Sequence, residues 1–238
     1  MTTPTKQQPS NISKKLLNSK RECVTEAISG LLCWNPGLAT LDGFDNVVLR
    51  HDWNSPARRS KVSLLTGGGS GHEPCFSGFV GEGMVTCAVQ GHIFAAPSAK
   101  SILAAIMALN WNKQGVLVLF NNYTGDRVNF GLAIEKARAK GVKIEIVINA
   151  DDCALNDGWR EVNRRGLAGI ILLLKMVGYV IESGDPLEKV AEFARECVLD
   201  IATMGVSWSS CSFPGGGPLF ELGADEMEIG LGWIFSIC

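Results

Sequence analysis

The most informative segment for the fold is Lys61-Val-Ser-Leu-Leu-Thr-Gly-Gly-Gly-Ser-Gly71. Its first half is a short run rich in β-branched and aliphatic residues, which is typical of a buried strand. Its second half, residues 67–71, holds four glycines and one serine. Such a run predicts a tight turn at which the backbone approaches a neighbouring segment closely.

Outward from this junction, segments with helical and strand-like patterns alternate. Helices are expected over 11–33, 98–109, 128–140, 167–182 and 187–204, with Asn11 or Ser13 as a cap of the first and Gly141 after the third. Strands are expected over 47–49, 115–120, 142–148 and 206–213, and turns over 121–126 and 215–218. This alternation predicts an α/β fold with a mixed, largely parallel sheet flanked by helices.

Composition excludes several classes of function. The 238 residues include 22 basic and 24 acidic ones, for a net charge of -2, and no basic cluster, so neither a nucleic-acid nor a membrane partner is expected. The most apolar stretch, 167–181, contains Lys175 and is shorter than the ~20 residues that span a bilayer; a buried helix is expected there. Eight cysteines without a CxxC pair and three histidines without an HxxH pair argue for reduced thiols, a cytoplasmic protein and no zinc site.

Three polar clusters follow expected strands, at residues 67–73, 122–126 and 151–152. In parallel sheets, ligands bind in the loops beyond the carboxyl ends of the strands. The three clusters are therefore expected to lie together at one edge of the sheet, as a site for a small polar ligand.

The first cluster, which ends in His72, has two interpretations. It is no Walker A loop, because the lysine of GxxxxGK[ST] is absent. Free backbone N–H groups of the glycine-rich turn can hold the oxygens of a small substrate, with His72 as general base or hydrogen-bond donor. The alternative is a structural turn with a solvent-facing histidine. His51 and His92 lack any such context and are taken as surface or structural.

The acidic residues of the other clusters also have two interpretations. Asp126 can orient a substrate hydroxyl or raise the basicity of an imidazole, or it can cap the helix expected from residue 128. Taken alone, the motif favours the cap. Asp151 and Asp152 are expected to serve as a strand-end turn or a cap.

Four motifs, in this order, resemble those of the dihydroxyacetone kinase (glycerone kinase) family. They are residues 67–74, residues 122–126 with Asn129-Phe130 after them, Arg164-Arg165-Gly166, and residues 226–230. The resemblance identifies residues 13–232 as a partial dihydroxyacetone-binding K domain, most similar to the animal triokinase branch. Residues 1–12 are then a disordered tail and residues 233–238 a divergent one.

The resemblance implies a kinase in two parts. The K domain binds dihydroxyacetone or glyceraldehyde and forms homodimers, while an ATP-binding L domain, in cis or in trans, carries ATP and Mg²⁺. The substrate pocket is then lined by Gly69, Ser70, Gly71 and His72, with His72 as the catalytic residue that helps to deprotonate the attacking hydroxyl. Asp126 corresponds to the residue that holds this hydroxyl. Asn121 stands where the family usually has a substrate-contacting lysine, and its amide can still donate a hydrogen bond.

The pattern of the family breaks off after Gly232. The relatives continue there with Ile-His-Gly-Glu, whose histidine binds the substrate covalently as a hemiaminal, whereas this sequence continues with Trp233-Ile-Phe-Ser-Ile-Cys238. We therefore expect a truncated isoform that has neither the covalent histidine nor the L domain, and no metal or cofactor bound to this chain.

Two functions remain open on these grounds. By family, the protein phosphorylates dihydroxyacetone to dihydroxyacetone phosphate with ATP, in glycerone catabolism. The alternative is a catalytically inactive binding or regulatory module, or an unstable fragment.

Overall fold

The central element of the computed structural model, which describes residues 15–154 and 164–230, is a six-stranded sheet. Its order is β1-β2-β4-β3-β5-β6, with bounds β1 Leu38–Leu41, β2 Phe44–Arg50, β3 Ser63–Ser70, β4 Cys87–Ile93, β5 Val116–Asn121 and β6 Ile144–Asn149. Strands β4, β3, β5 and β6 pair in parallel, and β1–β2 and β2–β4 pair antiparallel. The expected mixed, largely parallel sheet is confirmed.

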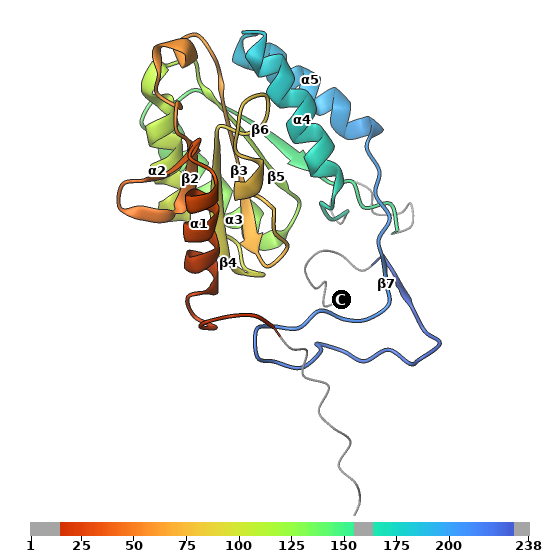
Figure 1. The fold of residues 1–238 in the computed structure, drawn as a ribbon. Helices are drawn as coiled ribbons and strands as arrows, with labels where there is room; N and C mark the ends of the chain where they lie inside the picture. The colour runs from red at the N-terminus through yellow and green to blue at the C-terminus, as the bar shows by residue number, and fades with distance from the viewer. Residues whose placement is uncertain (1–14, 155–163, 231–238) are drawn as a thin grey trace, which may run out of the picture.

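Helices cover both faces of the sheet (Figure 1). They are α1 Cys23–Trp34, α2 Ala99–Leu109, α3 Thr124–Arg138, α4 Gly169–Glu182 and α5 Leu187–Asp200, with short 3₁₀ turns at Pro56–Arg58, Ser77–Phe79 and Asn110–Asn112. One core joins α1, α4 and α5 to strand residues such as Leu64 and Leu117. The other joins α2 and α3 to the neighbouring residues Leu65 and Val118. The alternation of side chains along each strand thus builds two cores, one on each face.

The glycine run 67–71 is not the tight turn that the sequence predicted. Strand β3 continues through Ser70, and Gly67 and Gly68 still pair with Val89 and Gln90 of β4. The expected close approach of the backbone is nevertheless present, because a Cβ on Gly67 would overlap the main chain of Val89. The glycines therefore serve close packing within the sheet rather than a reversal of the chain.

Several expected boundaries are also wrong. Helix α1 begins at Cys23 instead of residue 11, and residues 15–22 are not helical; the proposed caps Asn11 and Ser13 lie outside the described residues, as do the two predicted tails. Helix α3 begins at Thr124 rather than 128, and α5 ends at Asp200 rather than 204. Of the strand expected over 206–213, only β7, Val206–Ser207, forms. Apolar periodicity locates these elements but not their ends.

Helix α4 is buried on one face only, since Leu173 and Val177 are in the core whereas Tyr179 is 71% exposed. Within the described ranges, no helix combines the length and the apolar character that crossing a bilayer requires.

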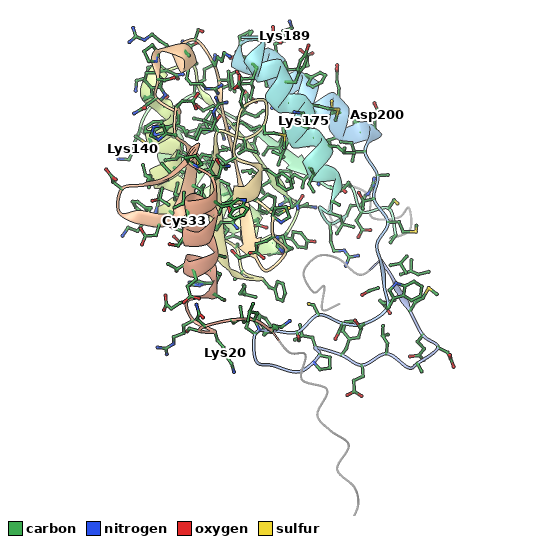
Figure 2. The ribbon with its side chains drawn as sticks, viewed as in Figure 1. Lys20, Cys33, Lys140, Lys175, Lys189 and Asp200 are labelled. Atoms are coloured by element: carbon green, nitrogen blue, oxygen red, sulfur yellow. The ribbon has the colours of Figure 1, made fainter. Side chains whose placement is uncertain are left out.

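Residues 201–230 form an arm that extends from the body (Figure 1). Two short strands, β7 and β8 (Glu228–Ile229), pair antiparallel within it. The arm reaches back toward the start of the described chain, where Lys20 Nζ donates to the carbonyl of Gly215 over 3.4 Å (Figure 2). Most of its side chains are at least partly exposed, and Trp208 is 75% exposed.

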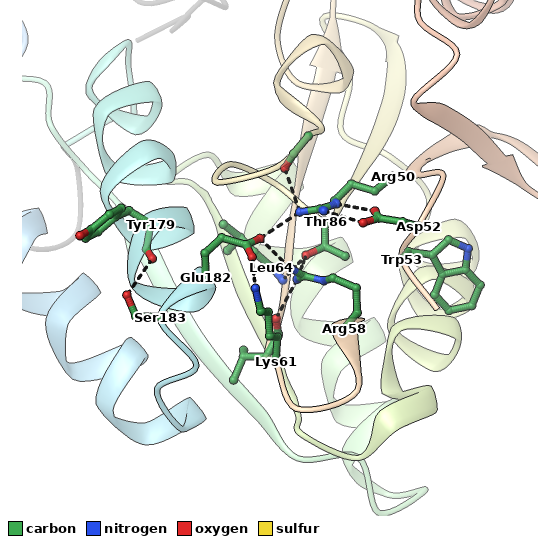
Figure 3. A network of polar contacts seen from close by, with 12 residues as sticks. Arg50, Asp52, Trp53, Arg58, Lys61, Leu64, Thr86, Tyr179, Glu182 and Ser183 are labelled. Atoms are coloured by element: carbon green, nitrogen blue, oxygen red, sulfur yellow. Dashed lines mark hydrogen bonds and ion pairs between the residues drawn. The ribbon is translucent and has the colours of Figure 1, made fainter. Parts of the chain in front are cut away.

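A network of ion pairs fastens the end of α4 to the segment between β2 and β3 (Figure 3). The Glu182 carboxylate accepts from Arg50 Nη1 at 2.9 Å, from Arg58 Nη1 at 2.5 Å and from Lys61 Nζ. Arg50 also pairs with Asp52 at 2.7 Å. Since Arg50 and Arg58 are both buried, Glu182 and Asp52 compensate charges that could not otherwise be buried.

Candidate functional site

The topology of the sheet singles out the carboxyl ends of β3 and β5. The connection from β3 to β4 runs over the face of the sheet that α1 and α4 cover, and its residues Phe76 and Val80 lie in that core. The connection from β4 to β5 contains α2 and runs over the opposite face. Strand order therefore reverses between β3 and β5, which is where open α/β sheets bind ligands. The pairing of these strands runs from Ser63–Val116 to Leu65–Val118, while β3 remains paired with β4 as far as Ser70–Ile93.

The end of β3 is shaped by close packing against residues 91–95. The register with β4 shifts between Gly68 and Ser70, and a Cβ on Gly69 would lie 2.8 Å from the nitrogen of Ala95. The buried Ser70 hydroxyl donates to the Gly91 carbonyl over 2.8 Å. Gly71 has φ +106°, and its N–H donates to Glu73 over 3.0 Å. The Ser70 hydroxyl and the Gly71 N–H are thus bonded within the fold and are not free, as they would be in an open turn.

His72 follows directly and is half-buried, not solvent-facing as the structural interpretation supposed. Its ring meets Phe76 edge to face, with 6.0 Å between centroids. Burial lowers the pKa of His72, an effect that the nearby Glu73 charge opposes. The imidazole is therefore neutral near pH 7 and able to accept a proton.

Asp126 lies in the first turn of α3 and is only 4% exposed. The N-cap of this helix is Tyr123, so the alternative that Asp126 caps the helix is wrong. Its Oδ1 is buried and has no hydrogen-bond partner within the described part of the chain. Burial raises the pKa of Asp126 to about 7. A buried carboxyl group with a spare acceptor and a near-neutral pKa is typical of functional sites.

Asn121, at the end of β5, is buried in a network of amides and carboxylates. Its Oδ1 accepts from Asn149 Nδ2 over 2.8 Å, and the same nitrogen lies 2.6 Å from Oδ1 of Asp151. Asp151 in turn accepts from the N–H groups of Leu167 and Gly169 over 2.5 and 2.7 Å, at the start of α4. The N-cap residue of α4 is Ala168, so Asp151 is not its N-cap, but its carboxylate binds N–H groups at the start of this helix. Asn149 is a residue that the sequence analysis missed.

Asp152 and Arg165 form a second buried cluster beside this one. Arg165 Nε and Nη2 lie 2.7 and 2.6 Å from Asp152 Oδ2. Asn122 Nδ2 donates to the carbonyl of Arg164 over 2.6 Å, so the Arg-Arg-Gly motif lies against the Asn-Tyr-Thr-Gly-Asp motif. The motif was visible in the sequence, but nothing there indicated a partner for Arg165.

Two hollows adjoin the end of β3. One, of about 550 Å³, is lined by Ser70, Gln90 and the apolar face of α1. The other, of about 280 Å³, is lined by Gly71, Glu73 and residues of the arm. Neither is lined by His72, Asn121 or Asp126. Across the described residues, no three His, Cys, Asp or Glu side chains gather as metal ligands would.

Comparison with known proteins identifies the family. The Dak1 domain pattern matches residues 29–234. The chain belongs to the dihydroxyacetone kinase family. It is 47% identical over 221 residues to the triokinase/FMN cyclase of Homo sapiens, covering 92% of this chain and 38% of that protein. It is 38% identical over 220 residues to the dihydroxyacetone-binding subunit of PTS-dependent dihydroxyacetone kinase 1 of Listeria innocua, covering 92% of this chain and 65% of the subunit.

The fold agrees with this family. The crystal structure of the dihydroxyacetone kinase from C. freundii in complex with AMP-PNP and Mg²⁺ superposes with a TM-score of 0.83 at 38% identity, covering 92% of this chain and 40% of that one. The chain spans 38% of the human protein and 40% of the C. freundii kinase, and so well under half of their length.

Proposed function

We propose that the chain binds dihydroxyacetone at the carboxyl ends of β3 and β5, as the substrate-binding part of an ATP-dependent dihydroxyacetone kinase. The observation that carries the proposal is Asp126, whose buried Oδ1 lacks a hydrogen-bond partner among the described residues. Asp126 follows β5, which is the neighbour of β3, and β3 leads at its carboxyl end into Gly71 and His72. A hydroxyl of the substrate would supply the missing donor.

His72 and Asp126 then share the work on the reacting hydroxyl. Asp126 accepts the hydrogen bond that orients the hydroxyl, and the neutral imidazole of His72 takes its proton as the oxygen attacks the γ-phosphorus of ATP. The bond between the γ-phosphorus and the bridging oxygen breaks, and ADP leaves with that oxygen. ATP and Mg²⁺ would be supplied by an L domain, in cis or in trans, and the reaction yields dihydroxyacetone phosphate.

Gly69, Ser70 and Gly71 are proposed to line the pocket through their main chain. Asn121 is proposed to contribute from the end of β5, where its Oδ1 already accepts from Asn149. The hydrogen bond from its neutral amide is weaker than the charge-assisted one that a lysine donates, so we expect weaker binding than a lysine at this position gives.

An ATP-coupled assay with the ATP-binding domain of a relative added in trans tests the kinase. We expect turnover of dihydroxyacetone, and separately of glyceraldehyde, that His72→Ala abolishes. The matched control is His51→Ala, because His51 is exposed and lies after β2. Turnover that His72→Ala leaves unchanged would contradict the assignment of His72.

A second function, binding without phosphoryl transfer, is favoured by one observation. The Listeria relative is by its name a dihydroxyacetone-binding subunit, and this chain covers 65% of it. In that case the chain binds dihydroxyacetone saturably but shows no turnover with the added domain.

A further inference from the structure

Gly230 is unusual in the arm because it is the one buried residue between 201 and 230. Its carbonyl accepts a hydrogen bond from Arg165 Nη2. Its N–H donates to the carbonyl of Gly205 over 2.8 Å, next to the β7–β8 pair. Among the described residues, Gly230 thus attaches the returning end of the arm to the body.

The shape of this point admits only glycine. Gly230 has φ +81°, which favours glycine, and a Cβ there would lie 2.6 Å from Cβ of Ala154. At residue 230 the chain passes very close to Ala154, and this brings the Gly230 carbonyl within reach of Arg165.

The cation that holds Gly230 is itself fixed in place. Asp152, whose side chain is fully buried, binds Nε and Nη2 of Arg165 through Oδ2 and accepts from the N–H of Ala154 over 3.0 Å through Oδ1. The main chains also pair, with the N–H of Asp152 donating to the Arg165 carbonyl over 3.0 Å. A buried ion pair with all these bonds fixes geometry more than it adds stability.

This cluster lies beside the candidate site. Asn122 binds the carbonyl of Arg164, and a Cβ on Gly166 would lie 2.6 Å from Cβ of Asn121. Burial raises the pKa of Tyr123, which lies between Asn122 and Asp126 in sequence, and the charges of Arg165, Asp152 and Asp126 also act on this phenol. The residues around Arg165 and those at the end of β5 therefore form one continuous structure.

We propose that Arg165 and Asp152 form a clamp that holds the arm at Gly230 against the carboxyl edge of the sheet, and that the affinity of the site for dihydroxyacetone depends on this clamp. The second half rests on the proposed function. Arg165 and Asp152 are positioning residues in this scheme, because they act on the site through the arm and through residues 121–126.

Two variants test the clamp, one at the arginine and one at the glycine that it holds. Arg165→Lys keeps the charge beside Asp152 but loses the donor that reaches Gly230. Gly230→Ala displaces the arm and leaves Arg165 and Asp152 intact. The matched control is Arg138→Lys, because Arg138 likewise binds a carboxylate, Glu135, and a carbonyl, that of Ile144, but on the outer side of α3.

The first readout is amide hydrogen exchange of the full chain. We expect the amides of Gly230 and Thr203 to exchange at least about tenfold faster in both variants, the loss expected for one charge-assisted hydrogen bond, while β5 keeps its protection. The second readout is dihydroxyacetone affinity by calorimetry, which should fall by about tenfold in both variants and not in Arg138→Lys.

The two readouts distinguish a failure of the clamp from a failure of the proposed function. Unchanged exchange at Gly230 and Thr203 in both variants would overturn the clamp. Faster exchange with unchanged affinity would overturn its effect on the site. A wild-type chain that binds no dihydroxyacetone would overturn the proposed function and the effect on affinity together, whereas the exchange rates would still decide whether the clamp exists.

Discussion

The side-chain nitrogen of Asn149 lies 2.8 Å from Oδ1 of Asn121 and so ties the end of β6 to the end of β5. The same nitrogen meets Asp151, whose carboxylate binds the first turn of α4. The edge of the sheet that carries the candidate site is thus held by buried polar groups in addition to the apolar packing of neighbours such as Phe120.

Asn149→Ala should destabilise the protein by about 1–3 kcal/mol, because it leaves the buried Oδ1 of Asn121 without a donor and removes one of the donors to Oδ1 of Asp151. Urea unfolding followed by circular dichroism measures this change. Asn18→Ala, which removes an exposed contact with Glu26, is the control and should stay within about 0.5 kcal/mol of wild type. Equal midpoints for the two variants would contradict the role given to Asn149.

Asp126→Asn should make the protein more stable above pH 7. Burial raises the pKa of Asp126 in the folded state to about 7, well above its ordinary 3.8. The folded protein therefore binds a proton more tightly than the unfolded chain, and stability falls as pH rises from about 4 to about 7. Asparagine does not titrate, so the variant does not lose stability over this range. Its free energy of unfolding should exceed that of the wild type by up to about 4 kcal/mol at pH 8, and the difference should vanish near pH 4.

Thermal unfolding of both proteins between pH 4 and pH 8 provides the comparison. Parallel pH profiles would mean that Asp126 titrates near its ordinary pKa and is not the buried acid that the site requires.

Glu182→Gln should cost about 3–5 kcal/mol, because the buried cations Arg50 and Arg58 lose their shared carboxylate. Burial tends to raise the pKa of Glu182, but the hydrogen bond from Lys61 and the three cations lower it overall. The stabilisation is therefore present above its ordinary pKa and lost as pH falls through the lower, folded value. Denaturant unfolding at pH 7 should show the full cost, and Glu135→Gln, in an exposed pair, should show almost none.

Gly69→Ala should impair folding or dihydroxyacetone binding, since its Cβ would meet backbone atoms of residues 94 and 95 at 3.1 and 2.8 Å. Gly131→Ala is the matched control, because nothing lies within 4 Å of a Cβ there and the position is inside α3. Replacing a helical glycine by alanine should stabilise by up to about 1 kcal/mol. If Gly69→Ala has the stability and the dihydroxyacetone affinity of the wild type, the close packing of residues 69 and 95 affects neither property.

The sequence predicted the architecture because apolar periodicity alternates clearly between strand and helix. It could not predict that β3 runs on through Gly67–Ser70, since a glycine run signals a turn unless a neighbouring main chain approaches closely. Here β4 does so, as the overlap of a Gly67 Cβ with Val89 indicates. The residues around the glycine run do not by themselves reveal this contact with another strand.

Part of the candidate site could also be predicted from the alternation of strands and helices. The positions of His72 and Asp126 after adjacent strands follow from the parallel sheet, and the family resemblance gave them roles. The contacts of Asn121 with Asn149 and of Arg165 with Asp152 join residues 28 and 13 positions apart, and no pattern in the chain pairs them. Only the folded arrangement tells a buried polar network from a set of solvated side chains.

The most direct measurement of the central claim is an NMR titration of the ¹⁵N-labelled chain with dihydroxyacetone. We expect saturable shifts in the amides of residues 69–72 and 121–126, which Asp126→Asn weakens and His51→Ala leaves unchanged. Saturable shifts confined to other parts of the chain, or none at all, would contradict a dihydroxyacetone site at the carboxyl ends of β3 and β5.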